Sequence, residues 1–196
     1  MKIKIETSAR HCHLSNKDLE RLFGKNYQLK PIKALSQPGQ FASRETIDIK
    51  APNGRINNVR ILGPTREATQ VEISQTDARQ LDIYPPIRQS GDIKKSCGAE
   101  LIGPKGSFKI KEGVIIAARH IHCDPITAKK LGLKDNQRVS IKTAGIRSVI
   151  FGNVIIRIHK DFSWAFHIDA DEANAVFDFS QKPKTEYGLL LTKSKK

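Results

Sequence analysis

The hydrophobic pattern along the chain predicts mainly β structure. Short runs alternate between apolar and polar side chains, and turn signals such as the Pro-Asn-Gly of residues 52–54 separate them. This alternation is typical of strands with one buried face. The clearest predicted strands cover residues 46–49, 58–62, 139–141 and 154–158.

Four short helices are predicted from their capping residues. A serine or aspartate side chain at a helix start accepts hydrogen bonds from backbone N–H groups that have no partner within the helix. A proline directly after Asp124 and glycines at the expected ends support the same assignment. The helices are expected after Ser15 (ending near Gly24), Ser74, Asp124 (ending at Gly132) and Asp169.

The chain contains an internal repeat. Residues 8–15 (SARHCHLS) recur as residues 117–124 (AARHIHCD), and each copy leads into a capped helix that ends in glycine. In a weaker repeat, residues 72–78 (EISQTDA) match residues 167–173 (HIDADEA) in polarity, in the isoleucine and in the helix cap. Each half of the chain therefore has two corresponding elements.

The repeated His-x-His pairs predict metal binding. Residues i and i+2 of a strand project from the same face, so each pair presents two imidazoles side by side. The weaker repeat offers each pair a third ligand. Three histidine or carboxylate ligands with one open position are typical of catalytic zinc, whereas structural zinc has four ligands and is often rich in cysteine. The predicted sets are His11, His13 and Glu72, and His120, His122 and His167.

A single His-x-His pair often arises by chance, and the repeat is what favours a metal site here. Five of the six histidines fall at repeated positions, and the sixth, His159, is interpreted as structural or exposed. Cys12 should face away from its neighbouring histidines as a buried apolar residue. Cys123 is either a ligand or nucleophile, or a packing residue, and packing is favoured because Leu14 is its counterpart.

Two further residues are candidates for substrate contact. Arg66 precedes Glu72, and its forked guanidinium suits the oxygens of a bound phosphate; a surface arginine is the alternative. Gln40 follows a Pro-Gly turn. It is a candidate for substrate contact only when taken together with the predicted metal ligands and Arg66.

Composition narrows the class of protein. The 196 residues are 38% hydrophobic and 28% charged, enough for one large domain or two small ones. No segment has the length of a membrane helix or a secretory signal, which predicts a cytosolic protein with no membrane partner. Three cysteines make a disulfide framework improbable. The formal charge of +14 would attract nucleic acid, anionic lipid or a phosphorylated small molecule.

These motifs together resemble the phosphate propanoyltransferase family, the PduL-type phosphotransacylases. The match runs in order through nearly the whole chain. The matching segments are residues 8–15, Pro38-Gly39-Gln40, residues 62–64 with Arg66, residues 69–74, Ala118-Arg119-His120 with His122, and residues 167–174.

The resemblance implies two small β-barrels with short capping helices and an active site in the crevice between them. It implies two zinc ions per chain, held by the two predicted donor sets, with Arg66 holding phosphate and Gln40 lining the site. Residues 10–117 would form the central barrel, residues 1–9 and 118–190 the second barrel, and residues 191–196 a basic tail. The resemblance also implies no microcompartment-targeting extension.

The reaction implied is the interconversion of acyl-CoA (propanoyl-CoA or acetyl-CoA) plus phosphate with acyl phosphate plus CoA. A zinc-dependent hydrolase of a phosphorylated or thioester substrate is the alternative, although no general base is evident near either pair. A nucleic-acid-binding module is disfavoured because aromatic residues are only 6% of the chain. The preferred acyl group, the residues that contact CoA and the oligomeric state stay open, and a homodimer is compatible with the sequence.

Overall fold

The computed structural model describes residues 1–178, 180 and 186–191. It divides into two compact units. The central unit is Ala9–Ala117, and the C-terminal unit combines Met1–Ser8 with Ala118–Lys196. Of the predicted basic tail, Leu191 belongs to a strand, and residues 192–196 lie outside the described residues. Within the described part of the chain, no helix has the length and apolar character needed to cross a membrane.

All four helices begin at their predicted caps. The side chains of Ser15, Ser74, Asp124 and Asp169 each accept a hydrogen bond from the backbone N–H three residues later. Ser74 and Asp169 also form reciprocal capping boxes with Asp77 and Glu172. The helices are α1 (Asn16–Phe23), α2 (Gln75–Leu81), α3 (Pro125–Leu131) and α4 (Ala170–Val176).

Strands make up most of the remaining structure, so the prediction of a mainly β protein with short helices is confirmed. The central unit contains β2 (His11–His13), β3 (Pro31–Ala34), β4 (Phe41–Ala51), β5 (Gly54–Gly63), β6 (Gln70–Glu72), β7 (Ile87–Arg88), β8 (Cys97–Gly103) and β9 (Gly106–Ala117). The C-terminal unit contains β1 (Lys2–Ser8), β10 (His120–Cys123), β11 (Arg138–Thr143), β12 (Ile150–Ile158), β13 (Ala165–Asp169) and β14 (Tyr187–Leu191).

Each unit closes six strands into a barrel, which confirms the two barrels implied by the resemblance. The C-terminal barrel has the order β1-β13-β10-β12-β11-β14 and closes where β14 pairs with β1. The central barrel has the order β4-β5-β2-β6-β9-β8 and closes where β8 pairs with β4. Closure removes the free sheet edges that would otherwise invite pairing with other chains.

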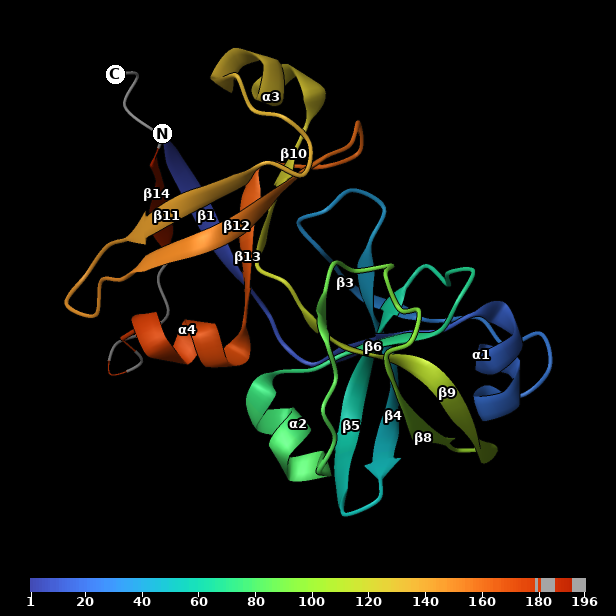
Figure 1. The fold of residues 1–196 in the computed structure, drawn as a ribbon. Helices are drawn as coiled ribbons and strands as arrows, with labels where there is room; N and C mark the ends of the chain where they lie inside the picture. Colours follow the sequence, from blue (N-terminus) through green and yellow to red (C-terminus); the bar gives the residue numbers. More distant parts are fainter. Residues whose placement is uncertain (179, 181–185, 192–196) are drawn as a thin grey trace. The chain divides into compact units, whose positions relative to one another are not determined.

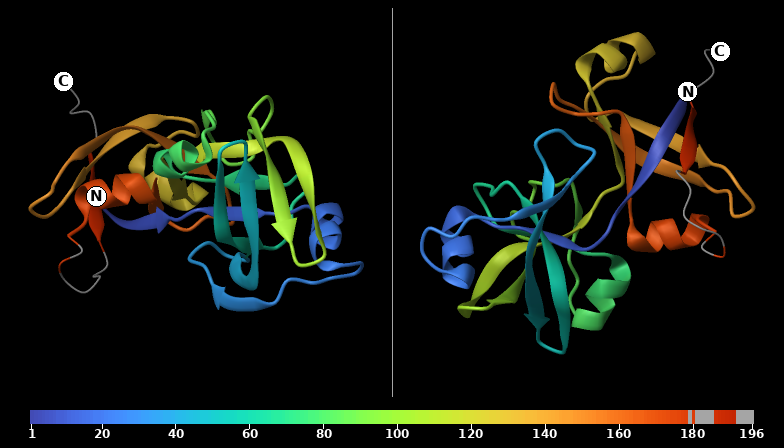
Figure 2. Two further views of the ribbon diagram at one scale, coloured as in Figure 1. Left: turned by 90° about the horizontal axis from the view of Figure 1, so that it is seen from below. Right: turned by 180° about the vertical axis from the view of Figure 1, so that it is seen from behind.

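The two barrels have the same arrangement of strands. In both, the His-x-His strand runs parallel to one neighbour and antiparallel to the strand that carries the third predicted ligand. Each third-ligand strand then pairs in parallel with a long strand, which is β9 in the central barrel and β1 in the C-terminal barrel. Figures 1 and 2 show β1 in blue beside the orange and red strands of the C-terminal unit. The N-terminal strand therefore takes the place in its barrel that β9 takes in the other.

Each barrel has its own hydrophobic core. The central core contains the fully buried Leu14, Ile61 and Leu101, and the C-terminal core contains Ile141 and Phe166. The side chains of Cys12 and Cys123 are buried in these two cores, one in each. Because strand residues alternate between faces, the cysteines turn inward and the flanking histidines turn to the other face.

Candidate functional site

The first predicted donor set comes together where two short strands pair. β2 runs antiparallel to β6 in a register that places His11 opposite Glu72. His13 lies two residues along β2 and so shares the face of His11. All three side chains are buried, and their candidate donor atoms lie within 4.8 Å of one another.

The second predicted donor set repeats this arrangement in the C-terminal unit. β10 runs antiparallel to β13, with His120 opposite His167. The rings of these two residues stack with centroids 5.1 Å apart, and the donor atoms of His120, His122 and His167 also lie within 4.8 Å of one another. The structure thus groups all six residues as the repeat predicted, while their role as ligands stays a prediction.

Backbone carbonyls orient the first histidine of each set. Nδ1 of His11 lies 2.8 Å from the carbonyl oxygen of Ala9, and Nδ1 of His120 lies 2.8 Å from that of Ala118. An imidazole that donates its Nδ1–H to a carbonyl has its lone pair on Nε2. Such partners are typical of metal-ligating histidines, because they hold both tautomer and ring orientation.

Burial and charged neighbours shift the pKa values of all three residues of the first set. Burial and the nearby Arg66 guanidinium lower the pKa of His13 to about 3, so its ring is neutral at neutral pH. Burial works against the charged forms of both His11 and Glu72, but their mutual attraction across 3.6 Å outweighs it. The pKa of His11 is therefore raised and that of Glu72 is lowered, which keeps the carboxylate ionised.

Both donor sets fit zinc by their chemistry. Two histidines with a carboxylate, and three histidines, are ligand sets found in catalytic zinc sites. Among the described residues, Nδ1 of His13 is a buried polar atom that makes no hydrogen bond, although burying such an atom without a partner is costly. A bound cation would satisfy this atom.

An arginine next to each His-x-His pair ties it to the helix that follows the third predicted ligand. Arg10 contacts the carboxylate of Asp77 at 2.9 Å, and Arg119 contacts that of Glu172 at 2.7 Å. Asp77 and Glu172 are the third residues of α2 and α4, where they complete the capping boxes. The two halves of the repeat therefore share this arginine–carboxylate ion pair as well as the candidate ligands.

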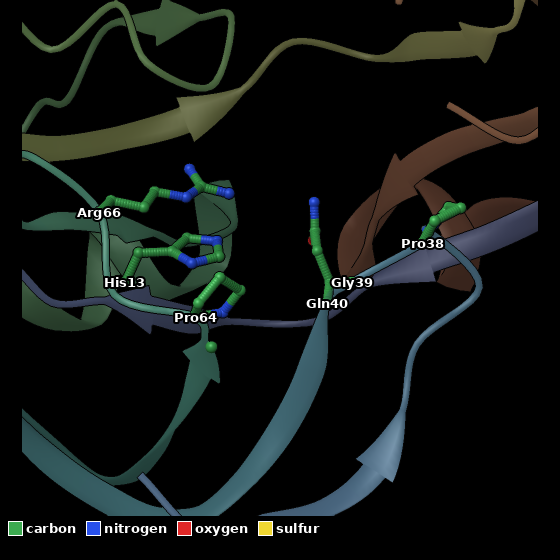
Figure 3. Close-up of a pocket in the computed structure, with 7 residues that line it drawn as sticks. His13, Pro38, Gly39, Gln40, Pro64 and Arg66 are labelled. Carbon is green, nitrogen blue, oxygen red and sulfur yellow. The ribbon is translucent and has the colours of Figure 1, made fainter. Parts of the chain in front are cut away.

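A pocket of about 240 Å³ opens beside the first donor set. Figure 3 shows the His13 ring and the Arg66 guanidinium extending into this pocket, with the side chain of Gln40 across from them. The lining residues are His13, Pro38, Gly39, Gln40, Gly63, Pro64 and Arg66. The two substrate-contact candidates from the sequence thus lie in one pocket with a predicted metal ligand.

Two polar residues of this region were missed in the sequence analysis. Gln70 donates hydrogen bonds to the carboxylate of Glu72 and to the hydroxyl of Ser90, and Arg66 donates to the same hydroxyl at 3.0 Å. Gln70 precedes Glu72 by two residues, so strand alternation could have placed it on the same face. Ser90 lies after β7 in a segment without a pattern, and no sequence signal indicates it.

The chain is similar to known proteins over most of its length. Residues 4–178 match the family model described as phosphate propanoyltransferase. The chain is 52% identical over 174 residues to the phosphate propanoyltransferase of Thermotoga maritima, covering 88% of this chain and 83% of the relative. It is 51% identical to the protein of the same name from Priestia megaterium, covering 88% and 80%. The chain belongs to the phosphate propanoyltransferase family.

Family membership confirms the resemblance and makes the chain a phosphate acyltransferase. It also disfavours the hydrolase alternative, because the matching relatives are named as transferases. The family match includes all six predicted ligands as well as Gln40 and Arg66, since these residues lie between positions 4 and 178.

Neither buried cysteine has the environment of a nucleophile. Burial and the neighbouring carboxylate of Asp124 raise the pKa of Cys123 to about 11, so little thiolate exists at neutral pH. Its Sγ lies 3.3 Å from the carbonyl oxygen of Asp124, and its side chain belongs to the C-terminal core.

The Cys123→Ala variant is therefore expected to keep its phosphate acyltransferase activity. We expect kcat/KM to stay within about twofold of the wild type, and stability to fall by about 1 kcal/mol because one buried atom is lost. Steady-state kinetics and chemical denaturation measure the two effects. An inactive variant that still binds zinc would instead point to an acyl-cysteine intermediate.

Proposed function

We propose that this protein interconverts acyl-CoA plus phosphate with acyl phosphate plus CoA, using propanoyl-CoA or acetyl-CoA, and that each donor set binds one zinc ion. The observation that carries the proposal is the pocket in which Arg66 and Gln40 lie beside His13. In this pocket, two side chains that can bind the oxygens of phosphate lie next to a predicted metal ligand. The family supports the class of reaction, and the donor chemistry supports zinc.

Arg66 is the residue that holds phosphate in this proposal. Its guanidinium is permanently charged and forked, so it can bind two phosphate oxygens at once. The contact from Arg66 to Ser90, and from Ser90 to Gln70, restricts the guanidinium before phosphate arrives. Phosphate held in a defined direction has already lost part of its translational and rotational entropy on binding. The activation free energy of the transfer step is lower for that reason.

The reaction itself is an acyl transfer to oxygen. An oxygen of phosphate forms a bond to the thioester carbonyl carbon, and the C–S bond breaks with its electron pair on the sulfur of CoA. Zinc held by the two donor sets would supply a Lewis acid for the developing oxyanion and a soft partner for the thiolate. Gln40 borders the same pocket and can donate its amide N–H to phosphate or to the carbonyl oxygen. No covalent enzyme intermediate is needed.

Phosphate dependence tests this proposal against hydrolysis. Purified protein is incubated with propanoyl-CoA with and without phosphate, and released thiol and acyl phosphate are both measured. We expect thiol release only with phosphate, with one acyl phosphate formed for each CoA. Equal thiol release without phosphate, and no acyl phosphate, would show that the protein is a hydrolase.

Metal content tests the zinc component separately. Elemental analysis of protein purified without a histidine tag is expected to find about two zinc ions per chain, one for each three-residue donor set. The metal-free protein should lose activity and regain it on adding zinc. Full activity in protein with almost no metal would refute the zinc component while leaving the acyltransferase class intact.

A further inference from the structure

Glu6 lies next to the second donor set without belonging to it. It is on β1, which runs parallel to β13 in a register that places Glu6 beside His167. His167 is in turn opposite His120 on β10. Residues at matched positions of paired strands point to the same face, so Glu6, His167 and His120 form one row across three adjacent strands. Glu6 lies beside His167 because the N-terminal strand β1 belongs to the C-terminal barrel, as Figure 1 shows.

The equivalent row of the central barrel differs in one respect. There β9 pairs with β6 so that Ile115 lies beside Glu72, which is opposite His11. Ile115 is fully buried and apolar. Each row therefore contains one carboxylate. In the central barrel it is Glu72, on the middle strand of the three, and in the C-terminal barrel it is Glu6, on an outer strand.

The contacts of Glu6 indicate how its carboxylate is used. Oε1 accepts a hydrogen bond from Lys4 at 2.8 Å, and Oε2 faces Nε2 of His167 at 3.8 Å. The side chain is only 16% exposed. Glu6 is not part of the group of donor atoms that lie within 4.8 Å of one another, and the member of that group that its carboxylate faces is His167.

We propose that Glu6 is a positioning residue that orients His167 toward the metal of the second donor set. This inference rests on the proposed zinc site. With Nε2 of His167 facing the Glu6 carboxylate at 3.8 Å, the negative charge favours the tautomer that has its proton on Nε2, and this leaves the lone pair of Nδ1 for the metal. His120 is held by a backbone carbonyl instead. A carboxylate at this place also puts a negative charge near a set of three neutral ligands, where it strengthens cation binding.

Zinc affinity measured by competition with a chromophoric chelator tests the proposal. The full chain with His11→Ala leaves the second donor set as the stronger site, and Glu6→Leu and Glu6→Gln are made in that background and in the wild type. We expect the zinc Kd of the second set to rise about 10- to 100-fold for Glu6→Leu, and less for Glu6→Gln, whose amide oxygen still accepts a hydrogen bond. In the otherwise wild-type chain, the affinity of the first set should stay unchanged.

Glu100→Leu is a matched control. Glu100 is also a partly buried strand glutamate with a lysine partner, Lys50, but it lies on β8 of the central barrel. Its replacement should leave both zinc affinities unchanged. Circular dichroism and the melting temperature of each metal-free variant separate loss of folding from loss of affinity.

Cobalt substitution distinguishes positioning from direct ligation. If Glu6 acts through His167, the visible absorption bands of the cobalt-loaded second set keep their shape in Glu6→Gln while the affinity falls. Bands that indicate a different coordination number would overturn the proposal and make Glu6 a ligand. Unchanged zinc affinity in both Glu6 variants would overturn it while the zinc site stands. A wild-type chain that binds no zinc would overturn the inference together with the zinc component of the proposed function.

Discussion

Replacing His120 by alanine is expected to remove one zinc ion per chain and to lower kcat by about a thousandfold or more, because metal-ion catalysis supplies several kcal/mol to the transition state. His120 is buried, lies in register with His167 and has its Nδ1 bound to Ala118. A methyl group in its place leaves two histidines, which hold zinc too weakly to retain it. Elemental analysis and steady-state kinetics of the same preparation measure both effects.

His159→Ala is the control for this prediction. His159 belongs to neither donor set, and its side chain is 54% exposed. Its loss should leave metal content and kcat close to those of the wild type. A His120→Ala variant with two zinc ions and normal turnover would contradict the assignment of the second donor set.

Replacing Arg66 by alanine is expected to lower kcat/KM for phosphate by about 100- to 1000-fold, because a charge-assisted bidentate contact to the oxyanion is lost. Arg66→Lys should recover only part of this loss, since lysine keeps the charge but not the fork. Initial rates with phosphate varied at saturating propanoyl-CoA measure the effect. Zinc content should stay unchanged, because Arg66 is in neither donor set.

Arg55→Ala provides the matched control. Arg55 is an exposed arginine of β5 in the same unit, and it pairs with Asp48. Its replacement should leave the kinetics with phosphate unchanged. If Arg66→Ala has a normal KM for phosphate and a normal kcat, the pocket beside His13 is not the phosphate site.

The local features of the fold were predictable from sequence because their causes are local. A capping side chain bonds to the backbone three residues away, so Ser15, Ser74, Asp124 and Asp169 each indicated a helix start correctly. Gly132, at a φ of 64°, ends α3 in the left-handed conformation that glycine adopts at little cost. Strand alternation was similarly informative for the long strands β4, β5 and β12.

Strand pairing depends on residues far apart in the chain, and the hydrophobic pattern alone did not specify it. Glu72 could be matched to His167 through the repeat, but only the registers of β2 with β6 and β10 with β13 place each beside its histidines. The pairing of β1 with β13 and β14 joins the two ends of the sequence. No local sequence signal indicates a contact between residues so far apart in the chain.

For the site, the repeat was the deciding sequence signal. It indicated the six candidate donor residues because a duplicated motif keeps equivalent side chains at equivalent strand positions. It could not indicate Ser90 or Glu6. Ser90 comes from a segment without periodicity, and Glu6 reaches His167 only because β1 is the strand beside β13.

The sequence by itself determined the two His-x-His pairs, their third partners, the helix caps and the family, because each depends on residue type and short spacing. The tertiary structure decided which strands are neighbours, and with them the pocket of His13, Gln40 and Arg66 and the row of Glu6, His167 and His120. The physical reason is that closing each barrel fixes the register of strands from distant parts of the chain, and register decides which side chains share a face.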